Sequence, residues 1–224
     1  MSTARNLVFS PGEYYHVFNR GVEKRPIFTE KRDYIRAQST IFYYKHSHPP
    51  VKYSKYLSTP RDQRSKLNAA LSQSAKDVAI LSYCLMPNHF HFLLRQESEN
   101  GIPQFISKFS NSYTKYFNTK HTRVGPLLQG TFKAVIVESE EQLIHLSRYI
   151  HINPVVSSLI KKIDLVSYPW SSMHEYITPT TYNLSDPSVI ISIFRSTSKY
   201  LEFCQNHLAY AEELERIKHL TIDI

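Results

Sequence analysis

Two apolar segments separated by a short turn limit the possible folds more than any other feature of the sequence. They span 78–85 and 90–94, and they flank the turn residues Met86-Pro87-Asn88. This pattern predicts two strands joined by a turn, or one long kinked strand. Both segments are too apolar for the open edge of a sheet, so we expect them in its interior.

Strands and helices alternate around this pair of segments. Aromatic and β-branched residues predict further strands at 14–18 and 131–137. Apolar residues at helical spacing predict helices from about Thr29, over 102–118, and over 140–153, with Ser139 and Gln142 forming a capping box and Pro154 ending the last helix. The order β, α, β, β, α, β, α indicates an α+β sandwich, in which helices cover one face of an antiparallel sheet.

The composition predicts one globular domain with additions. We assign residues 1–177 to the domain and residues 46–75 to a basic insertion within it, expected to be a solvated loop with a short helix near 63–71. Residues 178–224 are expected to form a helical C-terminal extension, with a helix start at Asp186-Pro187 and a long amphipathic segment at 198–219.

The charge balance favours an anionic partner. There are 27 Lys and Arg residues against 19 Asp and Glu residues, and 16 Tyr and 12 Phe residues are interleaved with them. Cations neutralise phosphates and aromatic rings stack on unpaired bases, so single-stranded nucleic acid suits this composition. Cys84 and Cys204 form no disulfide or zinc pattern, and we find no signal peptide or membrane span. We therefore expect a cytoplasmic, nucleoid-associated protein with no membrane partner.

A histidine pair lies at the start of the second apolar segment. Side chains alternate along a strand, so His89 and His91 share one face and Phe90 points to the other. Two neutral imidazoles on one face form half of a divalent-metal site. His46 and His48 have the same spacing, but they lie beside two prolines, and nothing in the sequence fixes their geometry.

Three polar residues recur at intervals of four along the helix predicted at 140–153. They are His145, Tyr149 and Asn153, which stack on one side of a helix. A tyrosine hydroxyl and an amide oxygen one turn apart can project together. An ordinary packed tyrosine and a helix stop at Asn153 are the alternative interpretation.

Five motifs lie in a characteristic order along the chain: YHVFNRG (15–21), MPNHFH (86–91), QGTFK (129–133), RYIHINPV (148–155) and YPWSS (168–172). In this order and spacing the sequence resembles the REP-associated tyrosine transposases, members of the single-tyrosine HUH transposase superfamily. The resemblance covers about residues 14–176.

The resemblance implies a ferredoxin-like α/β core with a metal site and a catalytic tyrosine. His89 and His91 match the metal ligands, and Tyr149 matches the nucleophile. Asn153 matches the position of the third ligand, which is often Gln in relatives, and His145 is the alternative ligand. Mg²⁺ or Mn²⁺ is the implied ion.

The expected function is therefore that of a DNA transposase and endonuclease. It would cleave and rejoin single-stranded, hairpin or REP-like DNA through a 5′-phosphotyrosine, as a monomer or homodimer. Arg20, Lys133 and Arg148 are candidates for phosphate contacts. The main alternative is a non-catalytic protein that binds DNA hairpins and descends from a transposase. Replication and conjugation initiators generally place the tyrosine before the histidine pair, and a zinc hydrolase lacks a third ligand at the usual spacing.

Overall fold

A four-stranded antiparallel sheet forms the centre of the molecule, in the order β2-β3-β1-β4. The computed structural model describes residues 7–178 and 183–208. The strands are β1 (Tyr14–Arg20), β2 (Val78–Met86), β3 (His89–Gln96) and β4 (Lys133–Val137). Because β1 lies between β3 and β4, the topology is the split βαβ arrangement of ferredoxin-like folds. The predicted α+β fold with an antiparallel sheet is confirmed.

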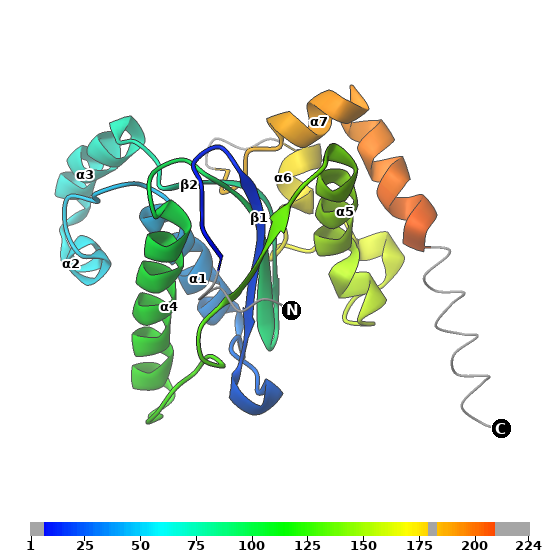
Figure 1. The fold of residues 1–224 in the computed structure, drawn as a ribbon. Coiled ribbons are helices and arrows are strands. Elements are labelled where there is room, and N and C mark those ends of the chain that lie inside the picture. The colour runs from blue at the N-terminus through cyan, green and yellow to red at the C-terminus, as the bar shows by residue number, and fades with distance from the viewer. Residues whose placement is uncertain (1–6, 179–182, 209–224) are drawn as a thin grey trace.

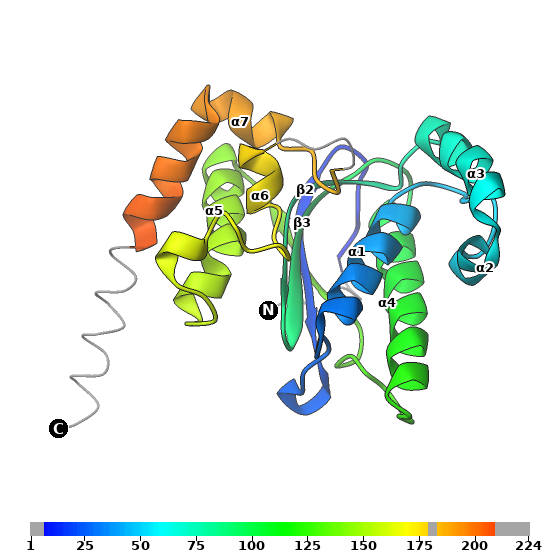
Figure 2. The same ribbon diagram turned by 180° about the vertical axis from the view of Figure 1, so that it is seen from behind.

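Helices cover both faces of this sheet, so the expectation of helices on one face is wrong (Figures 1 and 2). One face carries α1 (Lys31–Tyr44) and α4 (Gly101–Lys120), and the other carries α5 (Glu140–Val156), α6 (Met173–Ile177) and α7 (Ser188–Phe194). The physical reason lies in the two long strands. Alternate apolar residues of β2 and β3 enter two separate hydrophobic clusters, and each cluster needs its own helical layer.

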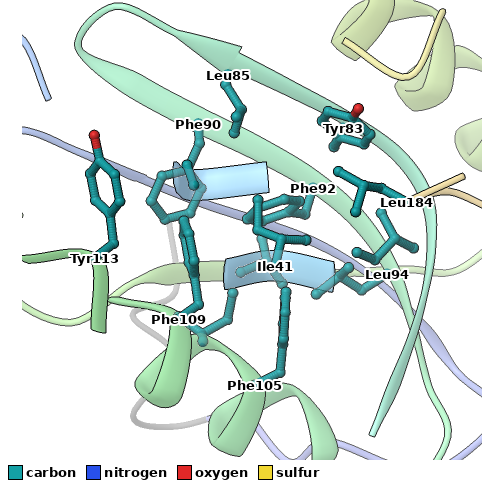
Figure 3. Close-up of a cluster of buried hydrophobic side chains, with 14 of the residues drawn as sticks. Ile41, Tyr83, Leu85, Phe90, Phe92, Leu94, Phe105, Phe109, Tyr113 and Leu184 are labelled. Carbon is teal, nitrogen blue, oxygen red and sulfur yellow. The ribbon is translucent and has the colours of Figure 1, made fainter. Parts of the chain in front are cut away.

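The core between the sheet and α4 is rich in aromatic rings (Figure 3). Phe90 of β3 lies 5.4 Å from Phe109 of α4, and Phe92 lies 5.8 Å from Phe105, measured between ring centroids. All four side chains are at most 1% exposed. Burying each ring stabilises the fold by about 1.5–3 kcal/mol. This packing fixes the orientation of β3 and turns its opposite face towards α5.

The strand β2 lies at an edge of the sheet, contrary to the expectation that its apolar sequence places it inside. All of its residues are nevertheless buried. Later parts of the chain cover its free edge. The Leu85 amide donates to the Trp170 carbonyl at 2.8 Å, the Ser172 amide donates to the Tyr83 carbonyl at 3.0 Å, and Asp186 makes a similar bond farther along the strand. This cover keeps water and other chains from the open hydrogen-bonding groups.

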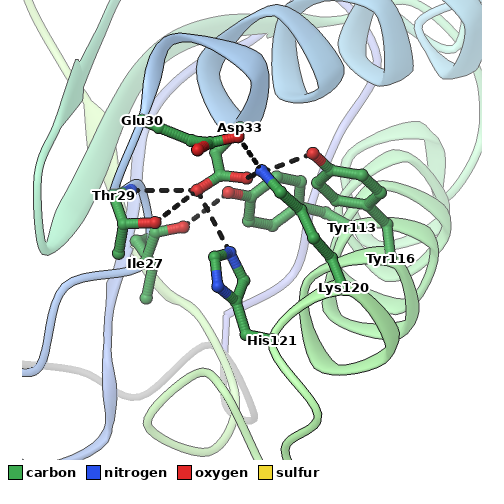
Figure 4. Close-up of polar contacts among 8 residues, drawn as sticks. All are labelled: Ile27, Thr29, Glu30, Asp33, Tyr113, Tyr116, Lys120 and His121. Carbon is green, nitrogen blue, oxygen red and sulfur yellow. Dashed lines mark hydrogen bonds and ion pairs between the residues drawn. The ribbon is translucent and has the colours of Figure 1, made fainter.

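A buried carboxylate joins α1 to α4 (Figure 4). Asp33 accepts hydrogen bonds from Thr29, from Lys120 at 2.7 Å and from Tyr116 at 3.1 Å, and it faces His121 at 3.4 Å. Burial raises the pKa of Asp33, but the hydrogen bonds from Lys120, Thr29 and Tyr116 outweigh it and lower the pKa to about 2. The two helices are therefore locked together by a charge that must remain paired.

The basic insertion is mostly helical, so the expectation of a solvated loop is wrong. It forms α2 (Tyr53–Ser58) and α3 (Arg61–Gln73), and α3 includes the short helix predicted at 63–71. Tyr53 and Leu71 pack with Tyr43 of α1 in a small core of their own. The remaining short elements are 3₁₀ turns at Val22–Lys24 and Lys162–Asp164.

The C-terminal part is helical where the structure describes it. The helix predicted at Asp186-Pro187 is α7, and residues 197–208 form a further helix. The remainder of the segment predicted at 198–219 lies outside the described residues. Within 7–178 and 183–208, no helix combines the length and apolar character needed to cross a membrane.

Candidate functional site

The turn between β2 and β3 places the histidine pair at the start of β3, on the face that α5 covers. His89 and His91 point to this face, with ring centroids 5.0 Å apart, while Phe90 enters the opposite core. His91 is only 6% exposed. The strand alternation predicted for this motif is therefore present.

Asn88, the last residue of the turn, fixes the ring of His89. The Asn88 amide nitrogen donates to the Lys24 carbonyl at 3.1 Å, so its oxygen must face His89, where it accepts from Nδ1 at 2.6 Å. The Gly21 amide holds the same turn by donating to the Asn88 carbonyl at 2.8 Å. A Cβ on Gly21 would lie 2.1 Å from the Arg25 carbonyl oxygen, so only glycine fits there.

His16 of β1 contacts the second histidine of the pair. Its Nε2 lies 2.9 Å from Nδ1 of His91, and the two rings stack with centroids 5.1 Å apart. Both side chains lie on the α5 face because Phe18, two residues along β1, pairs in register with His91. No local pattern in the sequence marks His16 as a site residue, because strand pairing brings it to the site from far along the chain.

The helix α5 brings Tyr149 and Asn153 to the histidines. Tyr149 is 46% exposed, and its ring stands perpendicular to that of His91, with centroids 5.6 Å apart. The Asn153 side chain lies close enough to His89 to act on the pKa of its ring. The helix begins as predicted, with the Ser139 side chain accepting from the Gln142 amide at 3.1 Å.

The expectation that Pro154 ends this helix is wrong. The helix α5 continues to Val156, with Pro154 inside it. Asn153 therefore has helical geometry and projects one turn beyond Tyr149, rather than closing the helix as a cap.

His145 does not join the histidine pair. Its Nδ1 lies 2.7 Å from a guanidinium nitrogen of Arg148, and its ring packs against Phe203 of the C-terminal helix. The other histidine pair also fails to form a site. His46 is buried with Nδ1 3.2 Å from the Ser74 hydroxyl, whereas His48 is exposed, so the two do not share a face. The geometry of His46 is thus fixed, contrary to expectation.

The imidazoles at the site stay neutral near pH 7. Burial lowers the pKa of His91 well below its ordinary value and that of His16 to about 4. Burial also lowers the pKa of His89, and the charge of Arg20 adds to this effect, whereas the neighbouring Asn153 side chain acts in the opposite direction. Two neutral imidazoles and an amide oxygen form a donor set that suits a small divalent cation.

The histidine pair is not part of a larger His, Cys, Asp or Glu cluster in the part of the chain that the structure describes. Residues 7–178 and 183–208 contain no cluster of three or more His, Cys, Asp or Glu side chains able to hold a metal ion. An amide as the third donor, as predicted for Asn153, is compatible with this finding.

The three basic residues predicted to contact phosphates lie in different surroundings. Arg20 pairs in register with His89, and its positive charge lowers the pKa of that histidine. Arg20 therefore flanks the histidine pair. Lys133 is exposed at the start of β4. Arg148 instead packs its guanidinium 4.1 Å from the centre of the Phe203 ring, beside the C-terminal helix.

A buried polar network holds α5 from the side opposite to Tyr149. His151 is fully buried, with Nδ1 2.6 Å from the Tyr200 hydroxyl and Nε2 2.7 Å from the Ser172 hydroxyl. Tyr200 also contacts Ser147 at 2.7 Å. Burial lowers the pKa of His151 to about 3. This network joins α5 to the residues that cover β2 and to the C-terminal helix.

These features define a class of protein: a ferredoxin-like α+β domain with two histidines, a tyrosine and an amide on one face of its sheet. Residues 43–153 match the family model described as transposase IS200 like. The match includes β3 and α5 up to Asn153. The chain belongs to the IS200-like transposase family.

Comparison with solved structures finds a shared fold in the first of two relatives. A REP-associated tyrosine transposase bound to a REP hairpin is 18% identical, with 83% of this chain and 91% of that chain covered and a TM-score of 0.51. A proposed transposase from Deinococcus radiodurans R1 is 15% identical, with 67% of this chain and 95% of that chain covered and a TM-score of 0.34. The search of curated proteins finds no match.

Proposed function

We propose that this transposase cleaves and rejoins single-stranded DNA through a covalent bond to Tyr149. The observation that carries the proposal is the approach of Tyr149 to the histidine pair from a separate element. Its ring lies 5.6 Å from that of His91, and it is 46% exposed, so a phosphate can reach its hydroxyl. A tyrosine whose only role is packing would be more deeply buried.

His89, His91 and Asn153 would hold Mg²⁺ or Mn²⁺, and Mn²⁺ matches imidazole better. When bound, the ion would supply Lewis-acid polarisation of a nonbridging phosphate oxygen. Asn88 holds Nδ1 of His89, and His16 lies against Nδ1 of His91, so Nε2 of each ring is the nitrogen that remains for a ligand. Arg20 beside His89 adds positive charge for the phosphate.

The hydroxyl oxygen of Tyr149 would attack the phosphorus in line with the 3′ oxygen of the scissile bond. The new bond joins this oxygen to phosphorus, the bond to the 3′ oxygen breaks, and the proton of Tyr149 is released as the departing oxygen takes one up. The 5′-phosphate stays on the tyrosine. Because the product is still a phosphodiester, another 3′ hydroxyl can reverse the step and join two strands.

The proposed substrate is a DNA hairpin with an unpaired foot. In-line attack needs a flexible phosphate, which unpaired DNA offers more readily than a duplex. The net charge of +8 favours phosphate contacts. The fold shared with a transposase that binds a REP hairpin supports the same class of substrate.

The test is to incubate the protein with labelled single-stranded hairpins and Mn²⁺ and to look for an adduct that survives SDS. Tyr149→Phe should form no adduct but still bind DNA, because only the attacking oxygen is removed. Tyr14→Phe, a partly buried tyrosine on the same face of the sheet, is the matched control and should retain the adduct. Hairpin binding without any adduct in the wild type would favour a non-catalytic hairpin-binding protein. An adduct in Tyr149→Phe would place the nucleophile on another tyrosine.

A further inference from the structure

We propose that His16 is a positioning residue that holds His91 in the tautomer needed to bind a metal ion. The proposal rests on the proposed function, since it concerns the same metal site. The observation behind it is the 2.9 Å contact between Nε2 of His16 and Nδ1 of His91. His16 lies on β1, outside the elements that supply His89, Tyr149 and Asn153.

A neutral imidazole carries one proton, so only one of the two nitrogens in this contact can donate. If His16 donates, Nδ1 of His91 accepts and the proton of His91 lies on Nε2, which then has no lone pair for a metal ion. If His91 donates from Nδ1, its Nε2 keeps the lone pair. Metal binding by His91 through Nε2 therefore requires His16 to be the acceptor.

The other ligand of the pair is controlled differently. The oxygen of Asn88 can only accept, so Nδ1 of His89 must donate, and its Nε2 keeps the lone pair. His16 can either donate or accept. The tautomer of His91 is thus the variable part of the site, and it depends on whether His16 donates or accepts.

The surroundings of His16 suit this role better than that of a third ligand. Its Nε2 is already committed to His91, so it cannot bind the same ion. Its ring stacks on Phe18, with centroids 4.8 Å apart, which restricts its rotation. The ring also lines a groove of about 510 Å³ together with Gln142 and His145.

The test compares three variants of the full chain. His16→Phe keeps a ring to stack on Phe18 but removes the acceptor. His16→Gln places an amide oxygen near the position of Nε2 and restores an acceptor. His145→Gln alters a histidine that lines the same groove but does not contact His91, and it is the control. Thermal melting and circular dichroism first establish that each variant is folded.

The first measurement is the Mn²⁺ affinity, by calorimetry without DNA. His16→Phe should bind Mn²⁺ roughly 10–100-fold more weakly than wild type, the usual effect of losing a group that orients a ligand. His16→Gln and His145→Gln should bind close to wild type. The second measurement is the ¹⁵N spectrum of the imidazoles without metal. It should show His91 protonated on Nδ1 in wild type and His16→Gln, and no longer so in His16→Phe.

The outcomes separate this inference from the proposed function. If wild type binds Mn²⁺ and His16→Phe binds it equally well with the tautomer unchanged, the role of His16 is refuted while the metal site stands. If wild type binds no Mn²⁺, the proposed metal site fails, and the spectra alone decide whether His16 sets the tautomer. A spectrum of wild type with the proton of His91 on Nε2 overturns the inference in either case.

Discussion

Replacing His151 with glutamine should flatten the dependence of stability on pH. His151 sits within the helix that carries Tyr149 and Asn153, and both of its ring nitrogens are bonded inside the core. Glutamine stays neutral at all accessible pH values and can still bond to Tyr200 or Ser172. The substitution therefore removes the titration and keeps part of the packing.

The expected magnitude follows from the two pKa values of His151. In the unfolded chain the pKa is 6.5, whereas burial lowers it to about 3 in the folded protein. Below pH 6.5 the unfolded state takes up a proton that the folded state cannot hold, so the free energy of unfolding falls as the pH falls towards 3. At pH 5.0 the solution is about 1.5 pH units below the unfolded pKa, which corresponds to about 2 kcal/mol.

The assay is urea denaturation of wild type and His151→Gln at pH 7.5 and pH 5.0. The variant should lose about 2 kcal/mol less than wild type between the two conditions. At pH 7.5 it should be less stable by about 1–3 kcal/mol, because one buried hydrogen bond is lost. The other histidines titrate in both proteins, so their contributions cancel in the difference. An equal loss in the two proteins would refute the assignment of His151 as a neutral, buried anchor.

Three further predictions concern the site, the core and the substrate. His89→Ala or His91→Ala should abolish Mn²⁺-dependent adduct formation in the SDS assay. The control is His48→Ala, which changes an exposed histidine of the other pair and should leave adduct formation intact. A loss of the adduct in His48→Ala would contradict the assignment of His89 and His91 as the metal-binding pair. Asp33→Ala should remove the buried acceptor shared by Thr29, Tyr116 and Lys120, leave Lys120 with Glu30 as its ion-pair partner, and lower the free energy of unfolding by about 3 kcal/mol in urea denaturation. An unchanged free energy of unfolding would contradict the role of Asp33 in joining α1 to α4. In competition binding at fixed salt, a hairpin should bind more tightly than a linear strand or a matched duplex, and preference for duplex would count against the proposal.

The parts of the fold governed by local rules could be predicted from the sequence. The hairpin around Asn88, the orientation of His89 and His91 on one face, and the capped start of α5 depend on residues a few positions apart. The edge position of β2 could not be predicted, because its cover comes from residues around Trp170. The sequence shows how apolar a strand is, but not which distant segment shields it.

The same distinction separates the expected site residues from His16. Tyr149 and Asn153 are recognisable because the period of the helix places them together. His16 reaches His91 only through the pairing register of β1 with β3, which no local pattern encodes. The aromatic residues around His16 in the sequence are typical of any half-buried strand, so they do not indicate a role for His16.

The continuation of α5 through Pro154 favours the proposed site. Had the helix stopped there, Asn153 would lie in a cap whose orientation differs from that of Tyr149. The continuous helix keeps Tyr149 and Asn153 on one stripe, while Ser147 and His151 form another that is bonded into the core. Successive residues turn by about 100° around a helix, so Tyr149 and His151 point roughly in opposite directions. The proposed nucleophile Tyr149 and the buried residue His151 thus lie on one rigid helix. Substitutions at His151 are therefore expected to affect Tyr149 by shifting α5, and not by changing a contact with DNA.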